Sequence, residues 1–178
     1  GDSTETVTID AGTGTTSVGV IGTGTEIGTL KIGSAQNGGI TLNGAITTDG
    51  VITIDGPITL ATAAITITTA DDNINLQGTV DGGKALTLAS GSGAVTVDGA
   101  IGSGTALTAL TVNDAGSGTI QIPNIGTSSA AGVTGATAIG NTSTGTLTLD
   151  GTVYTTNAAT YTAATGGGNI DITGAATF

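Results

Sequence analysis

Several residue types are missing from this chain, and each absence removes a class of protein. There is no Cys, which excludes disulfide frameworks and thiolate metal sites. There is no His either, so the Ser-His-Asp and Cys-His arrangements that activate a nucleophile cannot form. A polysaccharide-cleaving enzyme could still use paired carboxylates, but Asp71-Asp72 is the only adjacent acidic pair and Arg is absent. The sequence therefore predicts a protein that is not an enzyme.

Positive charge is almost absent. Lys31 and Lys84 stand against 13 acidic residues, and the net charge is −11. Nucleic-acid binding requires Lys and Arg to neutralise phosphates, and anionic membrane surfaces attract the same residues. No apolar run approaches the length of about 18 residues that a membrane-spanning helix needs. We expect no nucleic-acid partner and no membrane insertion.

Large side chains are also scarce, since Trp and Met are absent and Phe178 is the only Phe. The chain instead contains 40 Thr and 33 Gly, about two-fifths of its 178 residues. Thr and the branched aliphatics favour strands, whereas Gly supplies turn conformations. Only 8% of the residues are charged and two are Pro, a composition unlike that of disordered chains. The composition predicts a folded, all-β protein.

A short motif, apolar–polar–apolar, recurs eight times, with successive starts 23, 22, 22, 21, 25, 27 and 23 residues apart. The copies begin at Val7, Leu30, Ile52, Ile74, Val95, Ile120, Leu147 and Ile170. A fixed period of this length is typical of stacked-repeat proteins, in which each unit buries its apolar face against its neighbours. A second set of short strands lies between the copies, at 40–42, 65–67, 86–88 and 110–112.

These strands predict one domain over residues 1–178, a right-handed parallel β-helix (β-solenoid) of about 7–8 coils with roughly 22 residues each. Alternation along each strand directs the aliphatic residues inward and the central polar residue outward. The predicted core comprises Ile9, Ile32, Ile52, Ile54, Ile74, Leu76, Val95, Val97, Ile120, Ile122, Leu147 and Leu149.

A longer period is superimposed on the first. Every second copy has Thr at its centre and Asp after it, and these corner acids are Asp10, Asp55, Asp98 and Asp150. We interpret the alternation as a device that keeps like charges about 10 Å apart along the stack. Gly follows the corner residue in five copies, at positions 56, 78, 99, 151 and 174, and we interpret it as turn chemistry. The Ser-, Ala- and Gly-rich segment 126–145 is expected to be a bulging loop or an irregular coil.

The phrases ITIDGPI (52–58), VTVDGAI (95–101) and LTLDGTV (147–153), with the tail 159–178, resemble the β-helical shafts of large bacterial surface proteins. The group comprises filamentous-haemagglutinin-like adhesins and autotransporter passenger repeats, and the resemblance covers nearly the whole chain. It implies secretion, a right-handed parallel β-helix, and a role in adhesion or biofilm structure.

Two kinds of candidate site remain. Thr41, Thr66, Thr87 and Thr111 are expected to stack outward on consecutive coils, as in ice-binding faces, although β propensity alone also favours such a Thr ladder. Asp71, Asp72 and Asp81 are candidate ligands for calcium, which prefers oxygen donors, and solvated acidic corners are the alternative. Tyr154 and Tyr161 fit either a carbohydrate-stacking position or the filling of a widened coil. No other cofactor is expected.

Neither end of the sequence shows a charged edge or an amphipathic helix that would cap a solenoid. We therefore expect either a segment of a longer solenoid or molecules that associate end to end into filaments. The expected function is that of a non-catalytic, extracellular or cell-surface rod or fibre, structural or adhesive, with a cell-surface or glycan receptor as a further partner. The alternative is an ice- or glycan-binding module that uses the outward Thr ladder.

Overall fold

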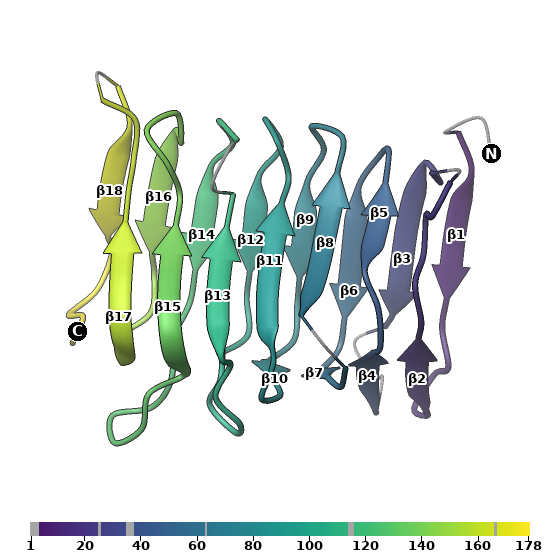
Figure 1. Ribbon diagram of the computed structural model, residues 1–178, viewed down its shortest axis with the longest axis horizontal. Helices are drawn as coiled ribbons and strands as arrows, with labels where there is room; N and C mark the ends of the chain where they lie inside the picture. The colour runs from purple at the N-terminus through teal and green to yellow at the C-terminus, as the bar shows by residue number, and fades with distance from the viewer. Residues whose placement is uncertain (1–3, 25, 35–37, 63, 114–115, 166) are drawn as a thin grey trace.

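The computed structural model describes residues 4–24, 26–34, 38–62, 64–113, 116–165 and 167–178. Over these residues the chain forms an all-β parallel solenoid of about 7 turns, with about 22 residues per turn and no helices. The coils stack along the long axis of the molecule, and the two termini lie at opposite ends of the stack (Figure 1). The predicted architecture is confirmed, while the handedness of the coil stays a prediction.

Three parallel sheets form the walls of the solenoid. The first has eight strands, which coincide with the eight copies of the motif and pair each with the next. They are β1 (Thr6–Ile9), β3 (Thr29–Gly33), β6 (Ile52–Asp55), β9 (Ile74–Leu76), β12 (Val95–Val97), β14 (Ile120–Ile122), β16 (Thr146–Leu149) and β18 (Asn169–Ile172).

The other two walls are a six-stranded and a four-stranded sheet. The six-stranded sheet contains β5 (Ile46–Thr48), β8 (Ile65–Thr69), β11 (Ala85–Ala89), β13 (Ala109–Val112), β15 (Val133–Ile139) and β17 (Thr156–Tyr161). The four-stranded sheet contains β2 (Thr15–Val18), β4 (Gly39–Leu42), β7 (Ile58–Leu60) and β10 (Val80–Asp81). Single bridges extend this last wall from Val80 through Ile101 and Ile125 to Tyr154.

Inward-facing aliphatic residues stack in register and form one continuous core. In the eight-stranded sheet, for example, Leu30 pairs with Ile52 and Ile52 with Ile74. Eleven of the twelve core residues named from the sequence are at most 1% exposed. Ile9 is the exception and is only partly buried, because β1 is the edge strand of its sheet.

The segment 126–145 forms the irregular coil that was one of its two expected forms. It contains β15, the longest strand in the described part of the chain, and the pairing of β15 with β17 shifts register between Val133 and Ala136. Val133, Thr137 and Ile139 of this strand face the core. Its middle residues are Gly, Ala and Thr instead of aliphatics, so the alternation that marks the other strands is weak here.

Buried hydroxyl groups close the corner between the six-stranded and the eight-stranded sheet. Thr48 and Thr69 are the last residues of β5 and β8, Ser90 follows β11 in the equivalent position, and all three are at most 4% exposed. Each side chain donates a hydrogen bond to a backbone carbonyl two or three residues ahead, on Gly50, Asp72 and Gly93 respectively. Buried hydroxyls need such partners, and these bonds also fix the turn.

Candidate functional site

The outer face of the six-stranded sheet carries most of the predicted Thr ladder. Thr66 pairs with Thr87 and Thr87 with Thr111, so the three side chains lie in one column on consecutive coils. Ala138 and then Thr160 continue the column. The strands of this sheet contain no Asp, Glu, Lys or Arg, so the face is free of charge.

The ladder needs one correction. Thr41 lies in the four-stranded sheet, where it pairs with Ser17 and Thr59, and not in the column of Thr66. The coil of Thr41 contributes β5 to the six-stranded sheet, and there Thr47 pairs with Thr68. Sequence alternation distinguishes inside from outside, but it does not indicate which of two outward walls a residue joins.

The charge-free face is wider than one column. β8 presents Thr66 and Thr68 on its outer side, the Thr-x-Thr arrangement that two adjacent columns require. A column of Ala lies on the side of the Thr66 column that is opposite to Thr68. In this column Ala85 pairs with Ala109, and Ala136 pairs with Ala158. The result is a surface of short, uncharged side chains.

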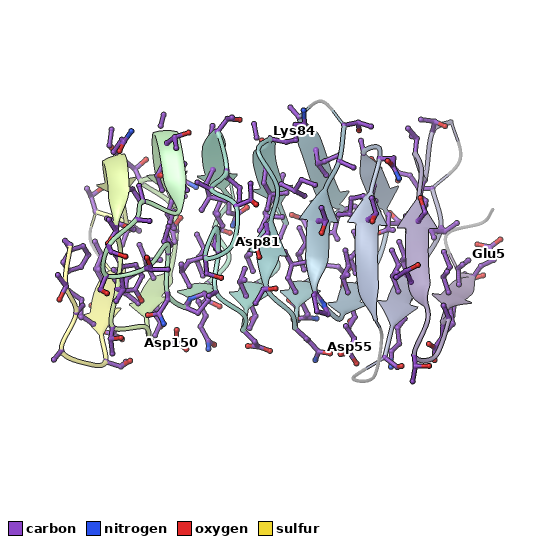
Figure 2. All side chains as sticks on the ribbon, turned by 90° about the horizontal axis from the view of Figure 1, so that it is seen from below. Glu5, Asp55, Asp81, Lys84 and Asp150 are labelled. Atoms are coloured by element: carbon purple, nitrogen blue, oxygen red, sulfur yellow. The ribbon has the colours of Figure 1, made fainter. Side chains whose placement is uncertain are left out.

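Acidic residues gather instead along the eight-stranded sheet. The residues that end or directly follow each strand form a corner column. Gly33 pairs with Asp55, and at the other coils the preceding strand residues pair in the same register. The column therefore contains, in order, Asp10, Gly33, Asp55, Gln77, Asp98, Pro123 and Asp150. Asp55 and Asp150 lie on the same side of the rod in Figure 2. Two strand spacings, about 10 Å, separate successive acids, and the amide of Gln121 donates to Asp150 Oδ2 across 2.7 Å.

The three calcium candidates lie at two different corners, and two of them, Asp71 and Asp81, accept hydrogen bonds from backbone amides. Asp71, in a left-handed conformation with φ of 69°, and Asp72 lie in the turn between β8 and β9, whereas Asp81 ends β10. Asp71 Oδ1 accepts the N–H of Ser92 at 2.8 Å. Asp81 Oδ1 accepts the N–H groups of Gly104 at 2.7 Å and Thr105 at 2.9 Å. Among the described residues there is no group of three acidic side chains that could hold a metal ion.

These contacts predict that Asp81 stabilises the fold without a metal. Asp81→Ala should lower the free energy of unfolding by about 1–3 kcal/mol, because two amides lose their acceptor. Asp81→Asn keeps a carbonyl oxygen in the same place and should cost clearly less. Urea unfolding of both variants, each with calcium and with a chelator, measures this. A stability loss that is equal for Ala and Asn and appears only with calcium would instead indicate a metal ligand.

An aromatic cluster lies at the C-terminal end of the stack. Tyr154 is 2% exposed, accepts the N–H of Gly151 at 2.7 Å and donates to the carbonyl of Ile122 at 3.0 Å. The Phe178 ring stacks on it, with centroids 5.4 Å apart, and Tyr161 contacts both rings edge-on. Tyr154 thus fills the interior of a coil and offers no surface for a sugar.

Burial raises the pKa of Tyr154 from 10.0 to about 12, and it also raises the pKa of Tyr161. The folded state therefore retains these phenolic protons more strongly than the unfolded state does. The resulting stabilisation is fully present below about pH 10, and we expect it to be lost as the pH rises toward 12. Tyrosinate absorbance should appear at higher pH in buffer than in urea. Two coincident curves with an intact circular dichroism spectrum would contradict the prediction.

The described residues enclose no pocket, and no helix among them is long and apolar enough to cross a membrane. No protein-family model, no curated protein and no solved structure matches this chain. The candidate surfaces are therefore the Thr and Ala face and the acidic corner column.

Proposed function

We propose that this chain is a non-catalytic structural segment, a stiff rod within a secreted or cell-surface protein that serves in adhesion or in a fibre. The observation that carries the proposal is the eight-stranded ladder, which runs without interruption from β1 to β18. Every coil is joined to the next through backbone hydrogen bonds in up to three walls. Seven spacings of about 4.8 Å give a rod of roughly 35 Å.

The surface fits this role better than it fits catalysis. The described residues form no pocket in which a substrate could be shielded from water, and the chain has no His or Cys. The resemblance of the phrases at 52–58, 95–101 and 147–153 to β-helical shafts of bacterial adhesins and autotransporter passengers supports a placement outside the cell. A receptor for such a segment would meet the outer walls, since the interior is filled by aliphatic side chains.

A spacer experiment tests the rod. The chain is inserted between a membrane anchor and a fluorescent reporter on the cell surface, and energy transfer to a membrane dye gives the distribution of reporter heights. A rod holds the reporter in a narrow distribution, whereas a Gly/Ser linker of 178 residues, the matched control, gives a broad one. Equal widths for both would contradict the proposal.

A second candidate function rests on the charge-free Thr face. Thr66, Thr87 and Thr111 repeat in register on one wall, and this regularity favours an ice- or glycan-binding module. Thr87→Lys on this face should abolish thermal hysteresis or glycan-array binding, whereas Thr53→Lys on the eight-stranded sheet should preserve it. Absence of both activities in the parent chain would remove the candidate.

A further inference from the structure

The corner between the six-stranded and the eight-stranded sheet lengthens along the chain. It has four residues after β8 (70–73), five after β11 (90–94), seven after β13 (113–119) and six after β15 (140–145). The corners after β13 and β15 lie side by side (Figure 1). Backbone carbonyls in such long corners lie outside the strand ladders, and where they are buried they need another hydrogen-bond donor.

Asn141 is that donor for the corner after β13. Its side-chain nitrogen, Nδ2, donates to the carbonyl of Asn113 and to the carbonyl of Gly116, each across 2.6 Å. Asn113 and Gly116 are both buried. The side-chain oxygen of Asn141 accepts the N–H of Ser143 at 2.6 Å. Both amide hydrogens of Asn141 are therefore used in contacts with the coil before it.

The backbone around Asn141 is fixed as well. The N–H of Asn141 donates to Thr144 Oγ1 at 2.8 Å, and the N–H of Thr144 donates to the carbonyl of Asn141 at 3.1 Å. Thr144 is fully buried, whereas Thr142 and Ser143 are exposed. This turn holds the Asn141 side chain against the neighbouring corner and leaves the next two side chains in solvent.

Asn141-Thr142-Ser143 is also an acceptor sequence for N-glycosylation. In that reaction Nδ2 of the Asn forms a bond to C1 of a sugar that is carried on a lipid-linked diphosphate. The bond between C1 and the diphosphate oxygen breaks, and the diphosphate leaves with the electron pair. One of the two amide protons passes to a base of the transferase, so the modified Asn keeps a single N–H.

The closed corner has no room for that sugar. A C–N single bond is about 1.45 Å long, and the oxygens that Asn141 Nδ2 contacts are only 2.6 Å from it. A sugar carbon in place of either hydrogen would overlap the facing oxygen, and one buried carbonyl would also lose its donor. Exposed Ser143 does not make the site accessible, because the atom that reacts is the bound Nδ2 of Asn141.

We infer that Asn141 is a conditional glycosylation site. It accepts a sugar only before this corner closes, and an attached sugar then keeps the corner open. Folding and modification therefore compete for the same amide nitrogen. That this competition occurs during secretion rests on the proposed function, whereas the exclusion itself rests on the contacts of Asn141 alone.

A second acceptor sequence in the same chain provides an internal control. Ser128→Asn with Ala130→Thr creates one in an exposed turn, where the backbone bonds between Thr127 and Ala130 do not involve the substituted side chains. The folded chain is incubated with a purified N-oligosaccharyltransferase and its lipid-linked donor, and the attachment positions are mapped by mass spectrometry. Sugar should appear at position 128 and not at Asn141.

The unfolded chain provides the opposite arm. Ile54 is fully buried, so the same two-sequence chain with Ile54→Asp loses its fold, which circular dichroism verifies before the assay. In this arm sugar should appear at position 128 and at Asn141. The comparison separates closure of the corner from a poor match between the transferase and the sequence around Asn141.

Production in a secretory host that contains the transferase tests the effect of the sugar on folding. Chains recovered with sugar at Asn141 should be degraded by a protease of broad specificity under conditions that leave unmodified chains from the same cells intact. Ser143→Ala is the control, because it removes the acceptor sequence while the bond to Asn141 uses only the backbone N–H of residue 143. It should yield resistant chains alone.

Urea unfolding tests the two bonds of the Asn141 amide directly. Asn141→Ala should lower the urea midpoint, and Asn141→Asp should lower it further, because a carboxylate would face the carbonyl oxygens of Asn113 and Gly116. Ser143→Ala should keep the midpoint of the parent chain.

Four results would overturn the inference: sugar at Asn141 in the folded chain, no sugar at Asn141 in the unfolded chain, a protease-resistant chain with the sugar attached, or a parental urea midpoint for Asn141→Ala. The spacer experiment can be made with Ser143→Ala, which carries no sugar at Asn141. Its height distribution is independent of these results, so failure of the conditional site and failure of the rod are distinguishable.

Discussion

Ile54→Asp is expected to unfold this chain at room temperature. Ile54 is fully buried in β6, between Ile32 on one side and Leu76 on the other. A carboxylate at this position would lie within the aliphatic core, and burying an unpaired charge costs several kcal/mol even if the group takes up a proton. We expect a loss of about 4 kcal/mol or more, a large fraction of the stability of an ordinary domain.

The neighbouring residue provides the control. Thr53 lies on the same strand and points outward, with only part of its surface covered. Thr53→Asp adds the same charge at the same height of the stack and should change stability by no more than about 0.5 kcal/mol. Circular dichroism during urea unfolding measures both variants. Equal stability of Ile54→Asp and the parent chain would show that the inward assignment of the alternation is wrong.

Gly78→Ala is expected to be nearly as damaging, although it adds only one methyl group. Gly56, Gly78 and Gly99 form a column at the corner that leads from the eight-stranded to the four-stranded sheet. A Cβ on Gly78 would lie 2.0 Å from the carbonyl oxygen of Gly56 and 2.2 Å from its carbonyl carbon. Both atoms belong to the backbone, so the clash is relieved only if two coils move apart. We expect a loss of about 3 kcal/mol, the upper end of what overpacking costs.

Gly83 gives the matched comparison. It is exposed in the same coil, and a Cβ there would meet no atom within 4 Å. Gly83→Ala should therefore be neutral or slightly stabilising, because Ala narrows the unfolded ensemble. Thermal unfolding of the two variants measures the cost of the contact between coils. Both variants add the same methyl group, so a difference between their midpoints cannot come from the general preference of the backbone for Ala over Gly. Similar midpoints for both would contradict the close backbone contact in the column.

The column of Gly56, Gly78 and Gly99 shows that turn conformation alone does not explain why Gly is needed at these corners. From the sequence, the Gly that follows the corner residue in five copies is interpreted as turn chemistry, in which Gly supplies a left-handed backbone. Gly56 has such a φ, +143°, but Gly78 and Gly99 do not. At these two positions the requirement is space: a Cβ on Gly99 would lie 2.3 Å from the carbonyl carbon of Gly78. Only contacts between coils reveal that reason.

Strands of the four-stranded sheet were the hardest to recognise from the sequence. The eight motif copies were identifiable because two aliphatics flank one polar residue in each. β10 was not identified as part of a third wall, since it contains only two residues, Val80 and Asp81. β7 (Ile58–Leu60) has the apolar–polar–apolar pattern, but it begins only three residues after β6 ends, and the alternation does not show that the chain turns into another wall between them. Ile101 and Ile125 continue that wall as single bridges. A lone aliphatic between Gly and polar residues carries no period that could distinguish a strand from a loop.

The sequence by itself determined the period, the inward residues and the alternation of acidic corners, because all three depend on spacing along one chain. The tertiary structure alone decided that the coil has three walls, that Thr41 and Thr66 lie on different ones, and that Asp71 and Asp81 bind separate backbone amides. The physical reason is that strand alternation has a period of two and separates only inside from outside. The direction in which each corner turns depends on hydrogen bonds and backbone contacts with the coils before and after it.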